Sequence, residues 1–295
     1  CSVTAGDIDN DGDIDLYFGD YDNGETTTVN QIYDYNDRLL INQFAQGSST
    51  FVDGTVAHFP ENIIISGARP FYQSAFGAKV RFVDINHDGY IDLVKQTALQ
   101  SPQYIGLAYN DPTNPGYFIN PEPIYTLAPY FFSLDDLNND GLEDLVVGDD
   151  SADRIMIHTG VQADGRVGFT EYTVSYSDPG FPGNSYIADL NNDGLKDVII
   201  GDVDVDSPGC SRVTKVCRNL GDLPNVTLQD QGNVFPIPMF AVHDIAVFDL
   251  NGDGWKDVIV GRCEGSHVML NDPPVGLRFL YPNGLISSLQ PNVLT

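Results

Sequence analysis

The sequence predicts an all-β fold, a β-propeller made of four-stranded blades, and three observations carry this prediction. The motif D-x-[DN]-x-D-G-x-x-D occurs five times in 295 residues, in units of about 50 to 60 residues with a longer first unit. Short β-branched or aromatic stretches bounded by Gly, Asp and Pro flank the motifs. Glycine (29 residues) and proline (18 residues) are frequent, which favours turns and short strands over long helices.

Each unit contains four strand-like stretches in a fixed order around the motif. The first precedes the motif, most clearly at residues 79–83, 130–134 and 246–248. The second follows the motif at residues 16–18, 145–147, 198–200 and 258–260, and is closed by Gly19, Gly148, Gly201 or Gly261. The third, at residues 38–42, 105–110, 154–158, 213–219 and 267–271, ends in Asn in four units and in His in the other. The fourth is led by an aromatic residue, as at 50–52 and 168–170, and four strands per unit predict a propeller blade.

The units divide the chain into five predicted blades of a single β-propeller domain, 1–295. The approximate bounds of the blades are residues 1–72, 73–126, 127–178, 179–238 and 239–295. A helical interpretation fails, because the apolar residues around the motifs form short runs and do not recur at i, i+3 and i+4 over a dozen residues.

The motif has the residue types and spacing of a calcium-binding loop. A hard dication takes roughly six to eight oxygen ligands, and a nine-residue turn can supply oxygens from positions 1, 3, 5, 7 and 9. The glycine at position 6 permits a sharp turn at positive φ, which lets position 7 offer its main-chain carbonyl. The position-7 residues are Asp13, Tyr90, Leu142, Leu195 and Trp255. An EF-hand is excluded, because it needs flanking helices and a Glu at position 12, where this chain has Phe18, Lys95, Val147, Ile200 and Val260.

The crowding of carboxylates favours loops that are occupied by metal. Two unit charges about 4 Å apart repel by about 4 kcal/mol at an effective dielectric constant near 20. The sequence therefore predicts about five bound Ca²⁺ ions, and Mg²⁺ is disfavoured because it demands tight octahedral geometry. The alternative is that these Asp- and Asn-rich turns only cap hairpins through Asx-turns. The predicted role of the ion is structural, because four side chains and a carbonyl surround it and lock the turn between the first two strands of a blade. Such a site is not evidence of catalysis.

These loops, the glycine-closed strand and the later Asn turn resemble FG-GAP and VCBS-type repeats, as in the propellers of integrin α-subunits and many secreted microbial proteins. The resemblance covers essentially the whole chain and implies a β-propeller with calcium loops in its blades. The side-chain ligands that it implies are Asp7, Asp9, Asp11, Asp15, Asp84, Asn86, Asp88, Asp92, Asp136, Asn138, Asp140, Asp144, Asp189, Asn191, Asp193, Asp197, Asp249, Asn251, Asp253 and Asp257. Propellers of this family commonly have seven blades, so the five units form either a five-bladed ring or part of a larger propeller.

The charge of the chain limits its partners. There are 42 acidic and 14 basic side chains, for a formal net charge of −28, so nucleic acid and anionic membrane surfaces, both polyanionic, are not expected partners. No apolar run approaches the roughly 20 residues that span a bilayer, and membrane insertion is not expected. The first residue is Cys1 and not Met, which indicates a processed chain or a piece of a longer one.

The cysteines and a glycosylation motif point outside the cytosol. Four cysteines allow three pairings. Cys210 and Cys217 flank a short basic stretch and are a candidate pair, which leaves Cys1 and Cys263 to fasten the first and last units; free buried thiols are the alternative. Together with the sequon at Asn225 and the calcium loops, these features predict an extracellular or cell-surface glycoprotein.

The sequence predicts a binding or adhesion module for a protein or a glycan, and no enzyme. It contains no G-x-S-x-G, H-E-x-x-H or phosphate-binding glycine loop. Propellers bind through loops, so residues 20–37 and 110–129 are the candidate contact segments, while Trp255 either stacks on a sugar or packs on its own hairpin. Two alternatives remain. One is a subunit of a self-assembling extracellular polymer, with residues 284–295 as one candidate contact, and the other is a polysaccharide-cleaving enzyme that uses a carboxylate pair.

Overall fold

The predicted all-β class is confirmed. The computed structural model describes residues 2–21, 36–60, 70–74, 76–77, 79–98, 102–174, 182–202, 212–222, 226–232, 234–262, 265–272 and 277–281. Within these ranges the secondary structure consists of strands, turns and bends without a helix. It follows that this part of the chain holds no helix long and apolar enough to cross a membrane.

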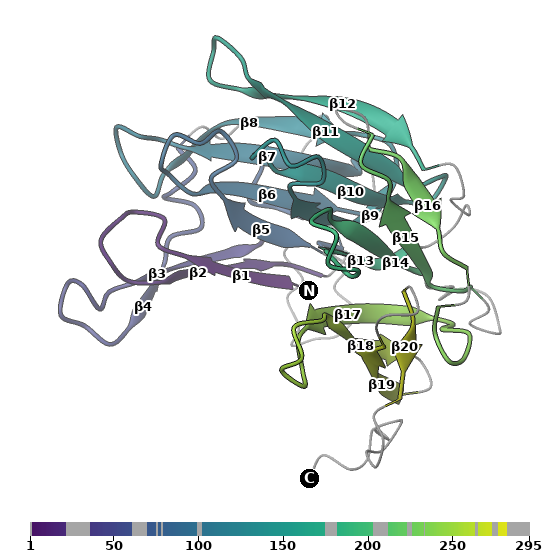
Figure 1. Ribbon diagram of the computed structural model, residues 1–295. Coiled ribbons are helices and arrows are strands. Elements are labelled where there is room, and N and C mark those ends of the chain that lie inside the picture. Colours follow the sequence, from purple (N-terminus) through teal and green to yellow (C-terminus); the bar gives the residue numbers. More distant parts are fainter. Residues whose placement is uncertain are drawn as a thin grey trace, which may run out of the picture. The chain divides into compact units, whose positions relative to one another are not determined.

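In the described residues, twenty strands form five four-stranded sheets, each of which is one blade of the β-propeller (Figure 1). Blade 1 contains β1 (Ser2–Gly6), β2 (Asp15–Gly19), β3 (Arg38–Asn42) and β4 (Phe51–Asp53), and blade 2 contains β5 (Val80–Val83), β6 (Asp92–Thr97), β7 (Tyr104–Asn110) and β8 (Phe118–Tyr125). Blade 3 contains β9 (Pro129–Asp135), β10 (Asp144–Asp149), β11 (Arg154–Val161) and β12 (Val167–Thr173). Blade 4 contains β13 (Pro182–Ala188), β14 (Asp197–Asp202), β15 (Lys215–Asn219) and β16 (Leu228–Asp230), and blade 5 contains β17 (Val242–Phe248), β18 (Asp257–Arg262), β19 (Gly265–Asn271) and β20 (Phe279–Leu280).

Strands that follow one another in the chain are neighbours in each sheet. The register of the first hairpin pairs Gly6 with Asp15 and Ser2 with Gly19, so the motif forms the turn between the first two strands of the blade. The same holds in blade 5, where Phe248 pairs with Asp257. Each predicted strand overlaps an observed one, and the predicted 38–42 coincides with β3.

Apolar side chains that alternate along these strands form the cores between neighbouring sheets. In blade 1, Tyr17 and Leu39 are fully buried and pack with residues of blade 2. Blades 3 and 4 share a cluster that includes Val146 and Val198, and a further cluster around Ile199 joins blade 4 to blade 5. Burial of side chains of this size stabilises the fold by about 1.5–3 kcal/mol each, and it fixes the position of the motif turns at the ends of the strands.

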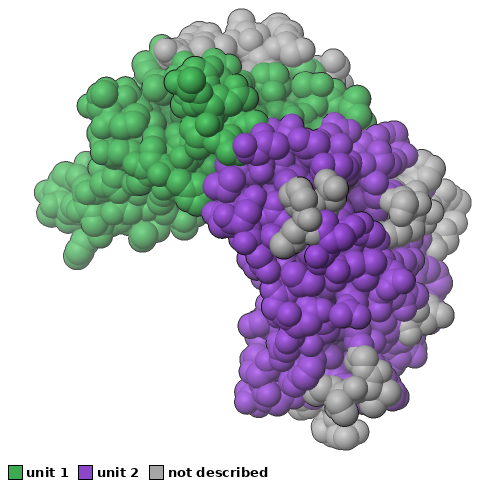
Figure 2. All heavy atoms as spheres, turned by 45° about the horizontal axis from the view of Figure 1, so that its top comes forward, with its two compact units in different colours: residues 1–130, 160–168 green, residues 131–159, 169–295 purple. Residues whose placement is uncertain are grey.

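Two compact units can be separated by their packing (Figure 2). The first comprises Cys1–Tyr130 and Gly160–Gly168, and the second comprises Phe131–Thr159 and Phe169–Thr295. The first unit holds blades 1 and 2, and the second holds blades 4 and 5. The single-domain organisation with the blade bounds given above stays a prediction.

A buried ion pair, which the sequence did not indicate, lies inside the first unit. Lys95 of β6 and Asp37, which precedes β3, are both fully buried, and the Lys95 Nζ donates to Asp37 Oδ2 at 2.5 Å. The same oxygen accepts a hydrogen bond from the Tyr17 hydroxyl at 2.6 Å, and the N–H of Asp20 donates to Asp37 Oδ1 at 2.9 Å. Burial lowers the pKa of the Lys95 amine, against the attraction of Asp37.

Several sequence predictions fall outside the described residues. These are the residues Cys1, Cys210, Cys263 and Asn225, most of the segment 20–37, and the tail 284–295. Cys217 is described and is fully buried in the core shared by blades 3 and 4. Both disulfides therefore stay predictions.

Candidate metal centres

The five motif turns, called loops 1 to 5 after their blades, share one hydrogen-bonding pattern. In this pattern the side chains accept hydrogen bonds from the main chain of the same turn. In loop 3, the Asp136 carboxylate accepts from the N–H of Asp140 at 3.1 Å and from the N–H of Gly141 at 2.9 Å. The Asp140 carboxylate in turn accepts from the N–H of Leu142 at 2.9 Å. Corresponding bonds to the first carboxylate occur in loops 1, 2, 4 and 5. The bond to Asp140 comes from two residues on and is an Asx-turn, whereas the bonds to Asp136 come from four and five residues on. Together these bonds hold the side chains of positions 1 and 5 against the turn.

Two left-handed residues bend each loop. The glycine at position 6 has φ between 85° and 93° in every copy, and position 4 also has a positive φ. The position-4 residues are Asn10 (φ 59°), His87 (φ 55°), Asn139 (φ 58°), Asn192 (φ 56°) and Gly252 (φ 78°). Asn and Gly adopt this conformation at lower cost than other residues, and this explains their recurrence. The predicted positive φ at position 6 is therefore observed in all five loops.

The aspartate at position 9 is the most buried group of each loop. Asp15, Asp92, Asp144 and Asp197 are fully buried, and Asp257 is nearly so. Each of these carboxylates accepts two main-chain N–H bonds. One comes from position 2 of the same loop, and the other comes from the Asn that ends the third strand, or from His158 in blade 3. The N···O distances are 2.8–3.2 Å. These bonds fasten the turn to the middle of the sheet.

Burial raises the pKa of four of these carboxyl groups. The pKa is raised to about 6 for Asp15, to about 7 for Asp92, and to about 6 for Asp144 and for Asp197. The accepted N–H bonds lower these pKa values, whereas other carboxylates of the same loop raise them. A negative charge is thus costly on these four carboxyl groups unless a cation lies beside them.

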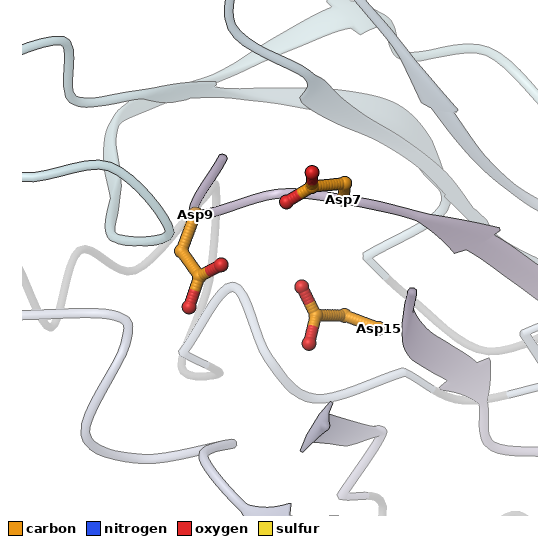
Figure 3. Close-up of side chains that lie close together, drawn as sticks. All are labelled: Asp7, Asp9 and Asp15. Carbon is orange, nitrogen blue, oxygen red and sulfur yellow. The ribbon is translucent and has the colours of Figure 1, made fainter. Parts of the chain in front are cut away.

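Three carboxylates converge in loop 1. One oxygen from each of Asp7, Asp9 and Asp15 lies within 4.8 Å of the others, and Figure 3 shows the three side chains turned toward a common space. Asp9 Oδ1 is buried without a hydrogen-bond partner among the described residues, and so is Asp13 Oδ1. The other Asp13 oxygen accepts the N–H of Ala45 at 2.8 Å. A buried carboxylate oxygen without a hydrogen-bond partner, on a side chain beside other carboxylates, fits a cation ligand.

Loops 2 to 5 differ from loop 1 at position 3, which is Asn. Its amide nitrogen donates to the position-5 carboxylate at 2.9–3.1 Å, as from Asn138 to Asp140. Each of these loops has Asp at positions 1, 5 and 9. Asp189 Oδ1 of loop 4 is also buried without a hydrogen-bond partner in the described part of the chain. Carboxylate, amide and main-chain oxygens form the donor set that hard divalent cations take.

The sequence alone did not predict that the asparagines of the third strands bind to the motif loops. Asn42, Asn110, Asn219 and Asn271 each donate a main-chain N–H to the position-9 aspartate and a side-chain N–H to the carbonyl of the residue before that aspartate. In blade 3, His158 keeps the main-chain bond to Asp144, at 2.8 Å, and its ring stacks on Phe169. The recurrence of Asn at the end of the third strand was the available signal.

The sheets and their motif turns define the chain as a β-propeller of four-stranded blades with acidic loops. Residues 136–200 match the family model of the FG-GAP-like repeat. This match covers loops 3 and 4, and it confirms the resemblance to FG-GAP repeats that the motifs predicted. No match was found among curated proteins.

A solved lectin structure has a similar fold. It is a lectin of Agrocybe aegerita, described by its specific recognition of non-reducing terminal N-acetylglucosamine, and it is similar over 98% of this chain and 67% of its own chain. The identity is 18% and the TM-score is 0.54. At this identity the likeness concerns the fold alone.

Proposed function

We propose that the protein is a calcium-stabilised β-propeller that acts outside the cell as a binding module for a glycan or a protein ligand. The observation that carries the calcium part is the convergence of Asp7, Asp9 and Asp15, with an orphaned oxygen on Asp9, in a loop that recurs in every blade. The binding part is supported by the propeller fold and by its likeness to a lectin. No enzymatic activity is proposed.

The ion would be held by side chains at positions 1, 3, 5 and 9 and by the carbonyl of position 7. A bound cation supplies the positive charge that the buried position-9 aspartates need. Its effect on the chain is structural, because position 9 belongs to the second strand of the blade while positions 1 to 5 follow the first. Loop affinities of about 10⁻⁴ to 10⁻³ M are expected for extracellular modules, and this range fits a protein that works at extracellular calcium concentrations.

Isothermal titration tests the calcium proposal. Protein that has been stripped with EGTA should take up about five Ca²⁺ ions in the affinity range given above for extracellular modules. Asp9→Ala should remove one of these sites, whereas Asp164→Ala, in the exposed turn between β11 and β12, should remove none. Titration that shows no binding heat and no change in thermal stability would overturn the calcium proposal.

A glycan array tests the binding proposal. The protein should bind a subset of glycans in calcium, and terminal N-acetylglucosamine is the first probe because the similar lectin recognises it. Binding should be lost in EGTA and restored by calcium. If neither glycans nor extracellular proteins bind to the calcium-loaded protein at concentrations up to about 1 mM, the low end of recognised affinities, the binding-module proposal is wrong.

A further inference from the structure

We propose that the calcium loops of blades 3, 4 and 5 bind metal cooperatively through a relay of hydrogen bonds, in which Asn219 and Asn271 are positioning residues. The inference rests on the proposed calcium function and deepens it, because it assigns roles to residues that offer no ligand oxygen to the ions. The relay joins groups within the second compact unit.

Asn271 joins loop 5 to loop 4. Its main-chain N–H donates to Asp257 Oδ1 of loop 5 at 2.9 Å. Its side-chain Nδ2 donates to the main-chain carbonyl of Leu190 at 2.7 Å and to that of Lys256 at 3.2 Å. Leu190 is position 2 of loop 4, between the proposed ligands Asp189 and Asn191. One side chain thus ties the position-9 carboxylate of loop 5 to the ligand-bearing backbone of loop 4.

Asn219 repeats this arrangement between loops 4 and 3. Its main-chain N–H donates to Asp197 Oδ1 at 2.9 Å, and its Nδ2 donates to the Leu137 carbonyl of loop 3 at 2.8 Å. The Leu190 N–H donates to Asp197 Oδ2 at 3.1 Å. Leu190 therefore accepts from Asn271 on its carbonyl side and donates to Asp197 on its nitrogen side, and this makes the relay continuous from loop 5 to loop 3.

A second set of bonds joins the same loops near the surface. Asn139, at position 4 of loop 3, donates its Nδ2 to the Gly194 carbonyl of loop 4 at 2.9 Å. Asn192, at position 4 of loop 4, donates to the Gly254 carbonyl of loop 5 at 3.1 Å. Each acceptor is the position-6 glycine of the following loop, next to the residue whose carbonyl would face the ion. Loops 3 and 4, and likewise loops 4 and 5, are therefore linked twice.

The burial of the relay explains why it would transmit an effect. Asn219 and Asp197 are fully buried, and Asn271 is 4% exposed. Buried donors and acceptors have no water to replace a lost partner, so breaking one bond is costly and the groups move together. An ion that orders one loop would lower the cost of ordering the next, and by linkage the effect is reciprocal.

Trp255 provides a local readout, since it is the single tryptophan of the sequence and lies at position 7 of loop 5. Its fluorescence is followed during calcium titration of EGTA-stripped protein. Asp193→Ala, which removes a ligand from loop 4, should raise the calcium midpoint reported by Trp255 at least about fivefold, the lower range of typical coupling between sites. Asp11→Ala, the same change in loop 1, should leave that midpoint within about twofold, because such a shift is below typical coupling.

Variants that remove the bonds between loops 4 and 5 complete a double-mutant cycle. In Asn192→Gly/Asn271→Ala protein, the shift caused by Asp193→Ala should fall to less than about twofold if the bonds carry the coupling. Asn192→Gly alone should reduce the shift in part, and it is compatible with the fold because loop 5 already has Gly252 at that position. An unchanged Trp255 midpoint in Asp193→Ala, with one site lost by calorimetry, would overturn the relay and leave calcium binding intact. A complete lack of calcium binding would overturn both.

Discussion

Lys95 is at the twelfth position counted from the start of its motif, where the other units have Phe18, Val147, Ile200 and Val260. The sequence shows this exception but gives no sign of its partner, because Asp37 lies 58 residues earlier in the chain, outside any motif. Only the packing of blade 1 on blade 2 brings the two together. By contrast, the positive φ at position 6 of each loop was predicted correctly, since this local geometry is set by neighbours within the nine-residue motif.

The buried pair makes a prediction about stability. Lys95→Met leaves the Asp37 carboxylate buried without its cation, and this should lower the free energy of unfolding by about 3–5 kcal/mol. Lys95→Met/Asp37→Asn removes the uncompensated charge and should regain part of that loss. Urea denaturation in calcium measures both variants.

The control is the surface ion pair of Arg166 with Glu122, in which the Arg166 side chain is 41% exposed. Arg166→Ala should lower the free energy of unfolding by no more than about 1 kcal/mol. Equal losses for Lys95→Met and Arg166→Ala would contradict the argument.

At the scale of the strand, the glycine that closes the second strand was predicted as a terminator, and in blade 4 this glycine, Gly201, serves close packing. A Cβ built at Gly201 would lie 2.7 Å from the Asn184 carbonyl oxygen and 3.1 Å from the Val242 carbonyl oxygen. These atoms belong to the backbones of β13 and β17, which cannot rotate away. The corresponding Gly261 of blade 5 has no heavy atom closer than 3.9 Å among those found around its Cβ position. Sequence shows the recurrence of glycine, but the reason depends on which strand lies against it.

The two glycines therefore form a matched pair of tests. Gly201→Ala should destabilise the protein by about 1–3 kcal/mol, because the strands must separate to admit the methyl group. Gly261→Ala should change stability by no more than about 0.5 kcal/mol, because the added methyl group meets no heavy atom closer than 3.9 Å. Chemical denaturation in calcium provides both values. Similar losses in the two variants would contradict the explanation by close approach.

At the scale of the whole molecule, the blades were predictable, because each sequence unit contains the patterns of its own four strands and of the turn between the first two. The links between blades were not predictable, since they join residues far apart in the chain, such as Asn271 and Leu190, which are 81 positions apart. The five loops also concentrate negative charge in a chain whose net charge is −28. Calcium is therefore expected to change the pH dependence of stability of the entire fold.

The sign of that dependence follows from the raised pKa values of Asp15, Asp92, Asp144 and Asp197, which are about 6 to 7 against 3.8 for a free aspartate. Without calcium, the folded state binds more protons than the unfolded state between about pH 4 and 7, so stability falls as pH rises through this window. A loss of about 1 kcal/mol of stability lowers Tm by ~2–4 °C in a domain of this order of size. The four groups together should therefore lower Tm by on the order of 10 °C between pH 5 and pH 8.

The measurement is made in 1 M KCl, because the Debye length of about 3 Å then screens the surface charges. The fall in Tm should persist in EGTA. It should be abolished by 5 mM calcium, a concentration about fivefold or more above the expected dissociation constants. Differential scanning calorimetry measures the four conditions, and a Tm that rises with pH in EGTA would contradict the assignment of buried, unneutralised carboxylates to the loops.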